Sequence, residues 1–160
     1  MAWTFTPLAG DINTVISAKL GTNTVANSGH LTDNDIGKPV KLLAAGRYGL
    51  CADGDNIDGF LVGVDPETVD GYAFGSVQTG GRIYAELDGA ATFGDIVEAG
   101  TMAAARTAEA NGYGIVSKHA GLALTSSDTV DEALPLIKSK KWRIISGSVT
   151  DESIVLLEKQ

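Results

Sequence analysis

Short apolar runs that end in glycine are the dominant pattern along the chain. Between residues 40 and 101 each run spans a few residues and closes on Gly or Asp-Gly, as at Asp53-Gly54 and Asp88-Gly89. Glycine adopts positive φ without steric cost, and Asp-Gly is a preferred hairpin turn. Apolar runs of about 4–8 residues between such turns are typical of strands. The pattern therefore predicts a rigid β module.

Alternation of apolar and polar residues, the period of a strand, locates the individual strands. We expect Gly80-Gly81 to form a hairpin turn, and Pro39 to stand near the start of a strand, where its missing N–H is harmless. The last two strands should form a terminal hairpin. The predicted strands are residues 36–43, 47–52, 57–64, 72–79, 82–87, 92–98, 113–118, 121–124, 142–149 and 154–157.

The first 35 residues have a different composition. Residues 3–6 alternate in the manner of a short strand, residues 11–20 fit either one or two helical turns or an extended arm, and residues 21–35 are rich in turn-forming types. We predict an N-terminal arm, residues 1–35, on a β domain of residues 36–160, within one domain overall. Long loose segments usually contact something, although a disordered terminus is the alternative. The isolated apolar anchors of the arm are Trp3, Phe5, Ile12 and Ile16.

Helices should be few. Residues 101–110 are rich in alanine and have high helix propensity, although a linker between strands also fits them. A second helix of about two turns is expected between Ser126 and Pro135. The fold class is therefore predicted to be all-β and mainly antiparallel. We expect a compact β-barrel or sandwich-like core with an extended N-terminal arm and at most two short helices.

The charge balance narrows the choice of partners. The chain has 12 basic and 20 acidic residues and a formal net charge of −8. Such a surface repels nucleic acid and anionic membranes, so neither is expected as a partner. The one basic cluster, residues 138–143, fits an acidic protein surface at least as well as it fits nucleic acid. Its candidate contact residues are Lys140, Lys141, Trp142 and Arg143.

Cellular location and redox state follow from what the sequence lacks. No signal peptide and no apolar run of about 20 residues is visible, which predicts a soluble protein made in a reducing cytoplasm. Cys51 is the only cysteine, so an intramolecular disulfide is impossible. Because Cys51 lies in an apolar run, we expect a buried thiol rather than a reactive one.

Candidate chemistry is sparse. The run Asp53-Gly-Asp-Asn-Ile-Asp58 resembles a calcium loop, but Ile57 and Val64 occupy positions where an EF-hand requires oxygen ligands, so a turn is expected. Neither His30 nor His119 has a partner at metal-ligand spacing. We expect no functional metal.

Catalytic motifs are missing as well. The chain has no nucleophile elbow, dinucleotide-binding fingerprint or phosphate loop. The acidic pairs Glu86/Asp88 and Asp95/Glu98 are typical of the solvated face of an acidic protein. We therefore expect no cofactor, no catalytic residues and no enzymatic activity.

Several of the glycine-bounded runs together resemble the capsid cement, or head decoration, proteins of tailed bacteriophages. Those proteins share short patterns such as G-x-x-V-x-L and G-d-x-V. The resemblance covers roughly residues 36–121, about half of the chain. The segments that carry it are Gly37-Lys-Pro-Val-Lys-Leu, Gly49-Leu-Cys-Ala-Asp-Gly-Asp, Ile57-Asp-Gly-Phe-Leu-Val-Gly-Val and Gly94-Asp-Ile-Val-Glu-Ala-Gly-Thr.

This resemblance implies a structural virion protein that is made in the host bacterial cytoplasm and resides on the capsid exterior. Its partners would be the major capsid protein and itself, as a homotrimer that clamps neighbouring coat subunits. Two other classes stay open. One is a small β-barrel module that binds host-surface carbohydrate, and the other is a small trimeric β-barrel enzyme. An exposed aromatic set would support the carbohydrate module, drawn from Trp3, Tyr48, Tyr72, Tyr84, Tyr113 and Trp142.

Overall fold

The computed structural model describes residues 13–21, 30–44, 46–65, 71–100, 113–119 and 141–159. Both predicted helices, the predicted strand 121–124 and the residues before 13 lie outside this part of the chain. The described residues form nine strands and one 3₁₀ turn, η1 (Asp33–Asp35). The strands are β1 (Thr14–Leu20), β2 (Pro39–Leu42), β3 (Tyr48–Leu50), β4 (Gly59–Val64), β5 (Ala73–Asp88), β6 (Val97–Ala99), β7 (Gly114–Lys118), β8 (Trp142–Gly147) and β9 (Ile154–Lys159).

Five strands close into a barrel in the order β1-β3-β2-β4-β5, with β5 returning to β1. Strand β1 pairs antiparallel with β5 over its whole length, from Thr14 opposite Gly80 to Leu20 opposite Ala73. Its contact with β3 is parallel and confined to Leu20 opposite Tyr48. The all-β fold and the barrel are therefore confirmed.

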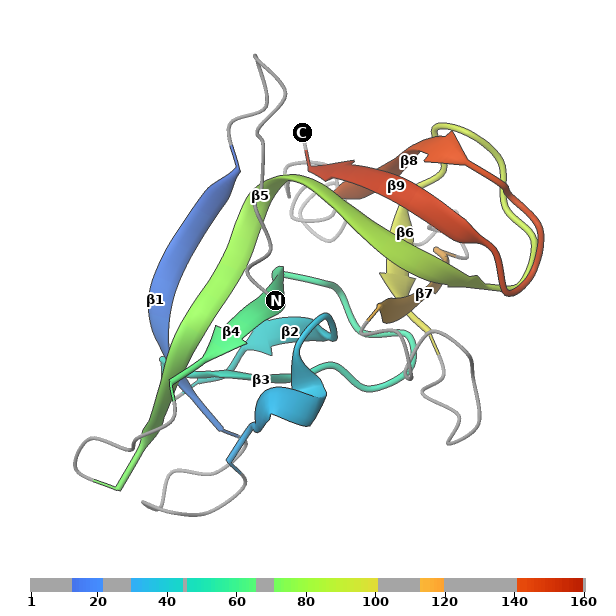
Figure 1. Cartoon of the computed structure of the whole chain (residues 1–160). Coiled ribbons are helices and arrows are strands. Elements are labelled where there is room, and N and C mark those ends of the chain that lie inside the picture. The colour runs from blue at the N-terminus through green and yellow to red at the C-terminus, as the bar shows by residue number, and fades with distance from the viewer. Residues whose placement is uncertain are drawn as a thin grey trace, which may run out of the picture.

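The remaining strands lie along the second half of β5, on the right in Figure 1. There β5 pairs with β7 in parallel and with β9 antiparallel, while β8 pairs with β9 and β6 with β7. An isolated bridge between Ile96 and Arg143 links the β6 region to β8. The β8–β9 hairpin was predicted, and a turn at residues 150–152 connects its strands.

Strand β5 runs unbroken through Gly80-Gly81, where the sequence predicted a hairpin turn. That prediction is wrong, because Gly80 still pairs with Thr14 of the barrel while Gly81 already pairs with Lys159 of the outer strands. Gly81 takes a φ of 87°, which lets β5 bend from one group of strands to the other. Nε2 of the buried Gln78 spans the bend by donating to the carbonyl oxygens of Gly80 and Arg82, at 3.1 and 2.8 Å.

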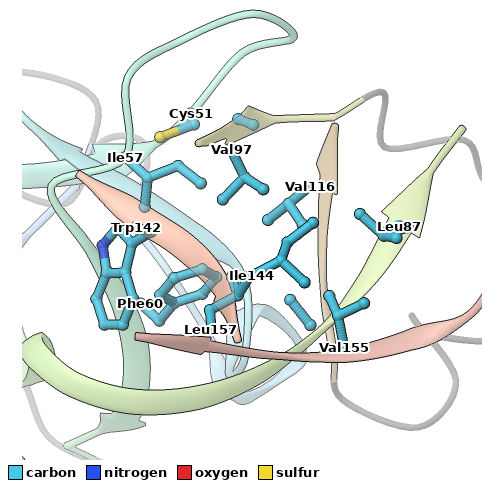
Figure 2. Packing of buried hydrophobic residues seen from close by; sticks show 12 residues of the cluster. Cys51, Ile57, Phe60, Leu87, Val97, Val116, Trp142, Ile144, Val155 and Leu157 are labelled. Carbon is cyan, nitrogen blue, oxygen red and sulfur yellow. The ribbon is translucent and has the colours of Figure 1, made fainter. Parts of the chain in front are cut away.

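Two apolar clusters lie on the two sides of strand β4. Leu61 packs into the barrel core with Leu20, Leu31, Val40, Ala73 and Val77. The neighbouring Phe60 faces the opposite way, into a larger core formed mainly by the outer strands (Figure 2). Its ring meets that of Trp142 edge to face, with centroids 5.1 Å apart. Successive strand residues point to opposite faces, so β4 serves both cores.

Part of the segment predicted as an arm belongs to the barrel. Residues 14–20 are a strand of the sheet, and Leu20 and Leu31 are buried in the barrel core, 1% and 4% exposed. The expected boundary at residue 35 therefore does not separate arm from core among the described residues. The strand forms because Ile16, Ala18 and Leu20 alternate with polar or smaller positions, a period that the helical alternative does not have.

Two other local predictions met different outcomes. Pro39 is the first residue of β2, as expected. The strand predicted for residues 92–98 is confined to its end, where β6 begins at Val97. Gly94 has a φ of 89°, and Thr92 donates from its N and Oγ1 to Oδ2 of Asp95, both at 2.8 Å. These bonds hold residues 92–95 in a turn, so the strand cannot begin there.

Candidate attachment surface

The edge of β1 that faces β3, here called the outer edge of β1, is a candidate strand edge for attachment. Among the described residues, β1 has a ladder partner on its β3 side only at Leu20. Val15 is 49% exposed and Ile16 is 37% exposed. Because successive side chains point to opposite faces, both faces of this end of β1 carry an exposed apolar residue. An edge of this kind can accept an additional strand.

The scaffold behind this edge is tightly packed. Strand β5 places Gly75 opposite Ala18 of β1 and Val64 of β4. A Cβ at position 75 would lie 2.3 Å from the carbonyl oxygen of Gly63 and 2.7 Å from Cδ1 of Leu20. The three strands thus approach closely, so β1 is packed firmly against β5 and its outer edge has a fixed position.

Of the four predicted anchors of the arm, one lies within the residues that the structure describes. Ile16 lies on β1 and is exposed, as a contact residue requires. Trp3, Phe5 and Ile12 lie outside the described residues. The structure therefore places one of these four candidates at the strand edge.

Only part of the basic cluster, residues 138–143, is accessible to a partner in the described part of the chain. Lys141 donates from Nζ to Oδ1 of Asn56, and Arg143 is exposed on β8. Trp142 between them is 1% exposed and belongs to the larger core, so its ring is not available to a partner. The alternation Lys-Trp-Arg, polar-apolar-polar, is the signal that would have placed it inward. Lys140 lies outside the described residues.

The acidic run 53–58 forms a turn, as expected. Asp55 accepts hydrogen bonds from Nζ of Lys41 and, at 2.6 Å, from the backbone N of Ala52. The bond from Lys41 is the main cause that holds the pKa of Asp55 below its usual value. Asp58 accepts from the N of Leu42 at 2.7 Å. In the described part of the chain, no three His, Cys, Asp or Glu side chains are grouped so that they could hold a metal ion.

The two acidic pairs have different surroundings. Asp95 pairs with Nζ of Lys118 at 3.0 Å, and Glu98 contacts Nδ1 of His119. Together these pairs fasten the end of β7 to the β6 region. Glu86 is 2% exposed, so the expectation of a solvated face is wrong there. It lies in the middle of the sheet, because β5 is flanked there by both β7 and β9.

Most of the aromatic residues named for carbohydrate binding are not exposed within the described ranges. Tyr84 is 56% exposed, while Tyr48, Tyr72 and Tyr113 are partly buried and Trp142 is buried. Of the six rings named for carbohydrate binding, Trp3 lies outside those ranges. Within the described ranges Tyr84 is the one exposed ring of this set, and Phe93, outside the set, is 60% exposed. These rings on separate segments give the carbohydrate alternative no specific support.

Among the residues that the structure describes, no helix combines the length and hydropathy needed to cross a membrane. Comparisons with protein-family models, with curated proteins and with solved structures found no match for this chain.

Proposed function

We propose that this protein is a capsid decoration, or cement, protein of a tailed bacteriophage. It binds the outer surface of the assembled head and bridges neighbouring coat subunits. The observation that carries the proposal is the outer edge of β1, which has exposed apolar residues on both faces and a rigid barrel behind it. The sequence resemblance over residues 36–121 supports the same role.

Attachment would proceed by strand addition. An extended segment of the major capsid protein pairs with β1, so that main-chain hydrogen bonds supply affinity with few demands on side chains. Val15 and Ile16 then bury apolar surface against the coat on either side of the new strand. No catalytic step is needed.

The assembly that fits this role is a homotrimer on the capsid exterior. A three-fold site offers three equivalent coat patches, and a trimer can contact all three together. Weak single contacts then gain from a high effective concentration. The acidic surface, at a net charge of −8, disfavours contact with the packaged DNA.

Binding to emptied phage heads tests the proposal. Ile16→Lys and Val15→Lys should weaken cosedimentation with the heads by at least about tenfold, because each places a charge in an apolar contact. Val62→Lys is the matched control, because Val62 on β4 is also 37% exposed. Thermal melting of each free variant separates lost binding from lost folding.

Electron microscopy of the virion gives the decisive result. We expect density for the chain on the outside of the head, and heads that lack the protein should rupture at a lower temperature. Density inside the shell or in the tail would refute the proposal, as would wild-type protein that does not bind heads.

A further inference from the structure

The outer edge of β1 lacks the usual protection of an exposed strand edge. Residues 14–18 read Thr-Val-Ile-Ser-Ala, without a charge or a proline, and the register irregularity against β5 lies at the first residue, between Thr14 and Val15. Charges, prolines and bulges keep edge strands from pairing with another chain, and a covering segment is the alternative. Because Val15 and Ile16 are exposed at this edge, we expect a covering segment in the free protein.

Main-chain groups of β1 point outward at this edge. Gly21 donates its N–H across the edge to the carbonyl oxygen of Tyr48. Alternate residues of a strand turn their N–H and C=O groups to the same side, so those of Val15 and Ser17 also point outward. A covering segment would pair with these four groups.

The side chain of Ile16 lies at the end of an apolar row. Ala18 and Leu20 pack in the barrel core, and alternation places Ile16 on the same face of β1. Ile16 stands opposite Val77 of β5, which in turn stands opposite Leu61 of β4. At 37% exposure, Ile16 can accept one more apolar side chain from a strand on the outer side.

The chain has a segment of matching pattern shortly before β1. Residues 1–12 lie outside the described part of the chain and end just before this strand. Their sequence alternates Trp3 and Phe5 with threonines, which is the period of a strand. Residues 7–13 connect this run to β1 and include proline, glycine and aspartate, which favour turns. Sequence and length therefore suit a hairpin between the run and β1.

We propose that residues 3–6 of the same chain cover the outer edge of β1, as an antiparallel strand, until a coat segment displaces them. Phe5 stands opposite Ile16 and extends the apolar row. Trp3 stands opposite Ala18, whose small side chain leaves room for the indole. The threonines lie on the other face, and their main chain pairs with the outward groups of β1.

The covering regulates attachment at the proposed site. A segment tethered by a short connection competes at high effective concentration, so the coat segment binds only the uncovered fraction of the protein. The displacement rests on the proposed capsid role, whereas the covering does not.

Amide hydrogen exchange of the full-length chain, without heads, tests the covering. The amides of Val15 and Ser17 should be protected in the wild-type protein. Phe5→Lys places a charge at the end of the apolar row and should speed their exchange by at least about tenfold. Leu8→Lys is the matched control, because it makes the same kind of change in the connecting residues and should leave the exchange unchanged.

A disulfide test locates the pairing. In a Cys51→Ala background, Thr4→Cys with Ser17→Cys should form a bond within one chain in oxidised glutathione. Residues directly opposite each other have Cα atoms about 5.5 Å apart, which a disulfide can span. Thr4→Cys with Ser76→Cys should form none, because Ser76 on β5 lies one strand further away, opposite Ser17. A bond between two chains would assign the edge to a second copy and overturn the proposal.

Cosedimentation with emptied heads tests the displacement. Phe5→Lys frees the edge and should tighten binding by at least about threefold relative to Leu8→Lys, which carries the same added charge. Equal head binding by these two variants would overturn the displacement.

The exchange data separate the covering from the capsid role. Unprotected amides at Val15 and Ser17 in the wild-type protein would overturn the covering, as would equal exchange in Phe5→Lys and Leu8→Lys. If the exchange result is as expected but no variant binds heads, the capsid role and the displacement are wrong while the covering stands.

Discussion

Gly75 shows how closely single residues are fitted in the barrel wall. It lies on β5 between β1 and β4, and a Cβ there would lie 2.3 Å from a backbone oxygen of Gly63. The oxygen belongs to the main chain, so it cannot move aside as the end of a flexible side chain can. By contrast, a Cβ at Gly63 would meet Cβ of Ser76 at 3.8 Å, an ordinary contact.

We predict that Gly75→Ala lowers the free energy of unfolding by about 2 kcal/mol or more, as overpacking does. Gly63→Ala, on the neighbouring strand, should change it by less than about 0.5 kcal/mol. Urea denaturation of both variants measures the difference. Equal stability would mean that β4 and β5 separate easily at this point.

Cys51 gives a second test at the residue scale. Burial, and then the charge of Asp55, raise the pKa of the Cys51 thiol to about 12. Because the thiolate is the reactive form, the native protein should resist alkylation at pH 8 and react fully once it is unfolded. The rate of iodoacetamide labelling with and without denaturant checks this, and rapid native labelling would contradict the burial of the thiol.

The same shift has a consequence for stability. The pKa of the thiol is higher in the folded protein than its ordinary value of 9.0. Its contribution to stability is therefore complete below pH 9 and is lost as pH rises toward 12. Cys51→Ala should flatten the fall in melting temperature over that range.

At the scale of the element, the bend in β5 is the feature that joins the two groups of strands. Gln78 supplies two hydrogen bonds to carbonyl oxygens on either side of Gly81. A strand that bends at glycine loses side-chain packing there, and the amide of Gln78 compensates by fixing the backbone.

We expect Gln78→Met, which keeps the length of the side chain, to destabilise the protein by about 2 kcal/mol because the carbonyls of Gly80 and Arg82 lose this donor. Thr79→Val is the matched control, since within the described residues Oγ1 of Thr79 makes one long bond, 3.4 Å to the O of Thr14. Its cost should stay below about 0.5 kcal/mol. Thermal melting compares the two, and equal losses would show that Gln78 does not brace the bend.

Local signals predicted most strands and failed where distant pairing decides the outcome. Pro39 and the terminal hairpin follow from nearby residues, and the structure agrees with both. Gly80-Gly81 carries the signal of a turn, yet pairing with β1 and β9 keeps it in a strand. Both partner strands come from distant parts of the sequence, so the residues near Gly80-Gly81 cannot predict this pairing.

The candidate sites show the same division. Ile16, predicted as an anchor, is 37% exposed on β1, whereas Trp142 is in the core although its flanking charges suggested a surface. Val15 was not among the predicted anchors. Its place on the outer edge depends on the register of β1 against β3 and β5, and it leaves no motif in the sequence.

At the scale of the whole molecule, two strands, β5 and β4, contribute residues to both cores and so couple them. Strand β5 contributes Val77 to the barrel core and Leu87 to the larger core, and β4 contributes Leu61 and Phe60 in the same way. The described strands should therefore unfold together rather than in two steps.

Leu20→Ala tests this coupling, because Leu20 is buried in the barrel core while Trp142 reports on the other core. In a Trp3→Phe background, the variant should lower the melting temperature seen by Trp142 fluorescence and by circular dichroism equally. The expected loss of stability is about 2–5 kcal/mol. A fluorescence transition that stays at the wild-type temperature would show that the cores unfold separately.

The pairing of β5 also sets an order of events during synthesis. Every strand of the barrel lies within residues 14–88, so all its members leave the ribosome early. The second half of β5 must wait for residues 154–159, its antiparallel partner, which are translated after every strand of the barrel. For several seconds, at ordinary translation rates, that half of the strand has an open edge beside the exposed Tyr84. The nascent chain is then most exposed to misassociation, and this interval is where a chaperone would act.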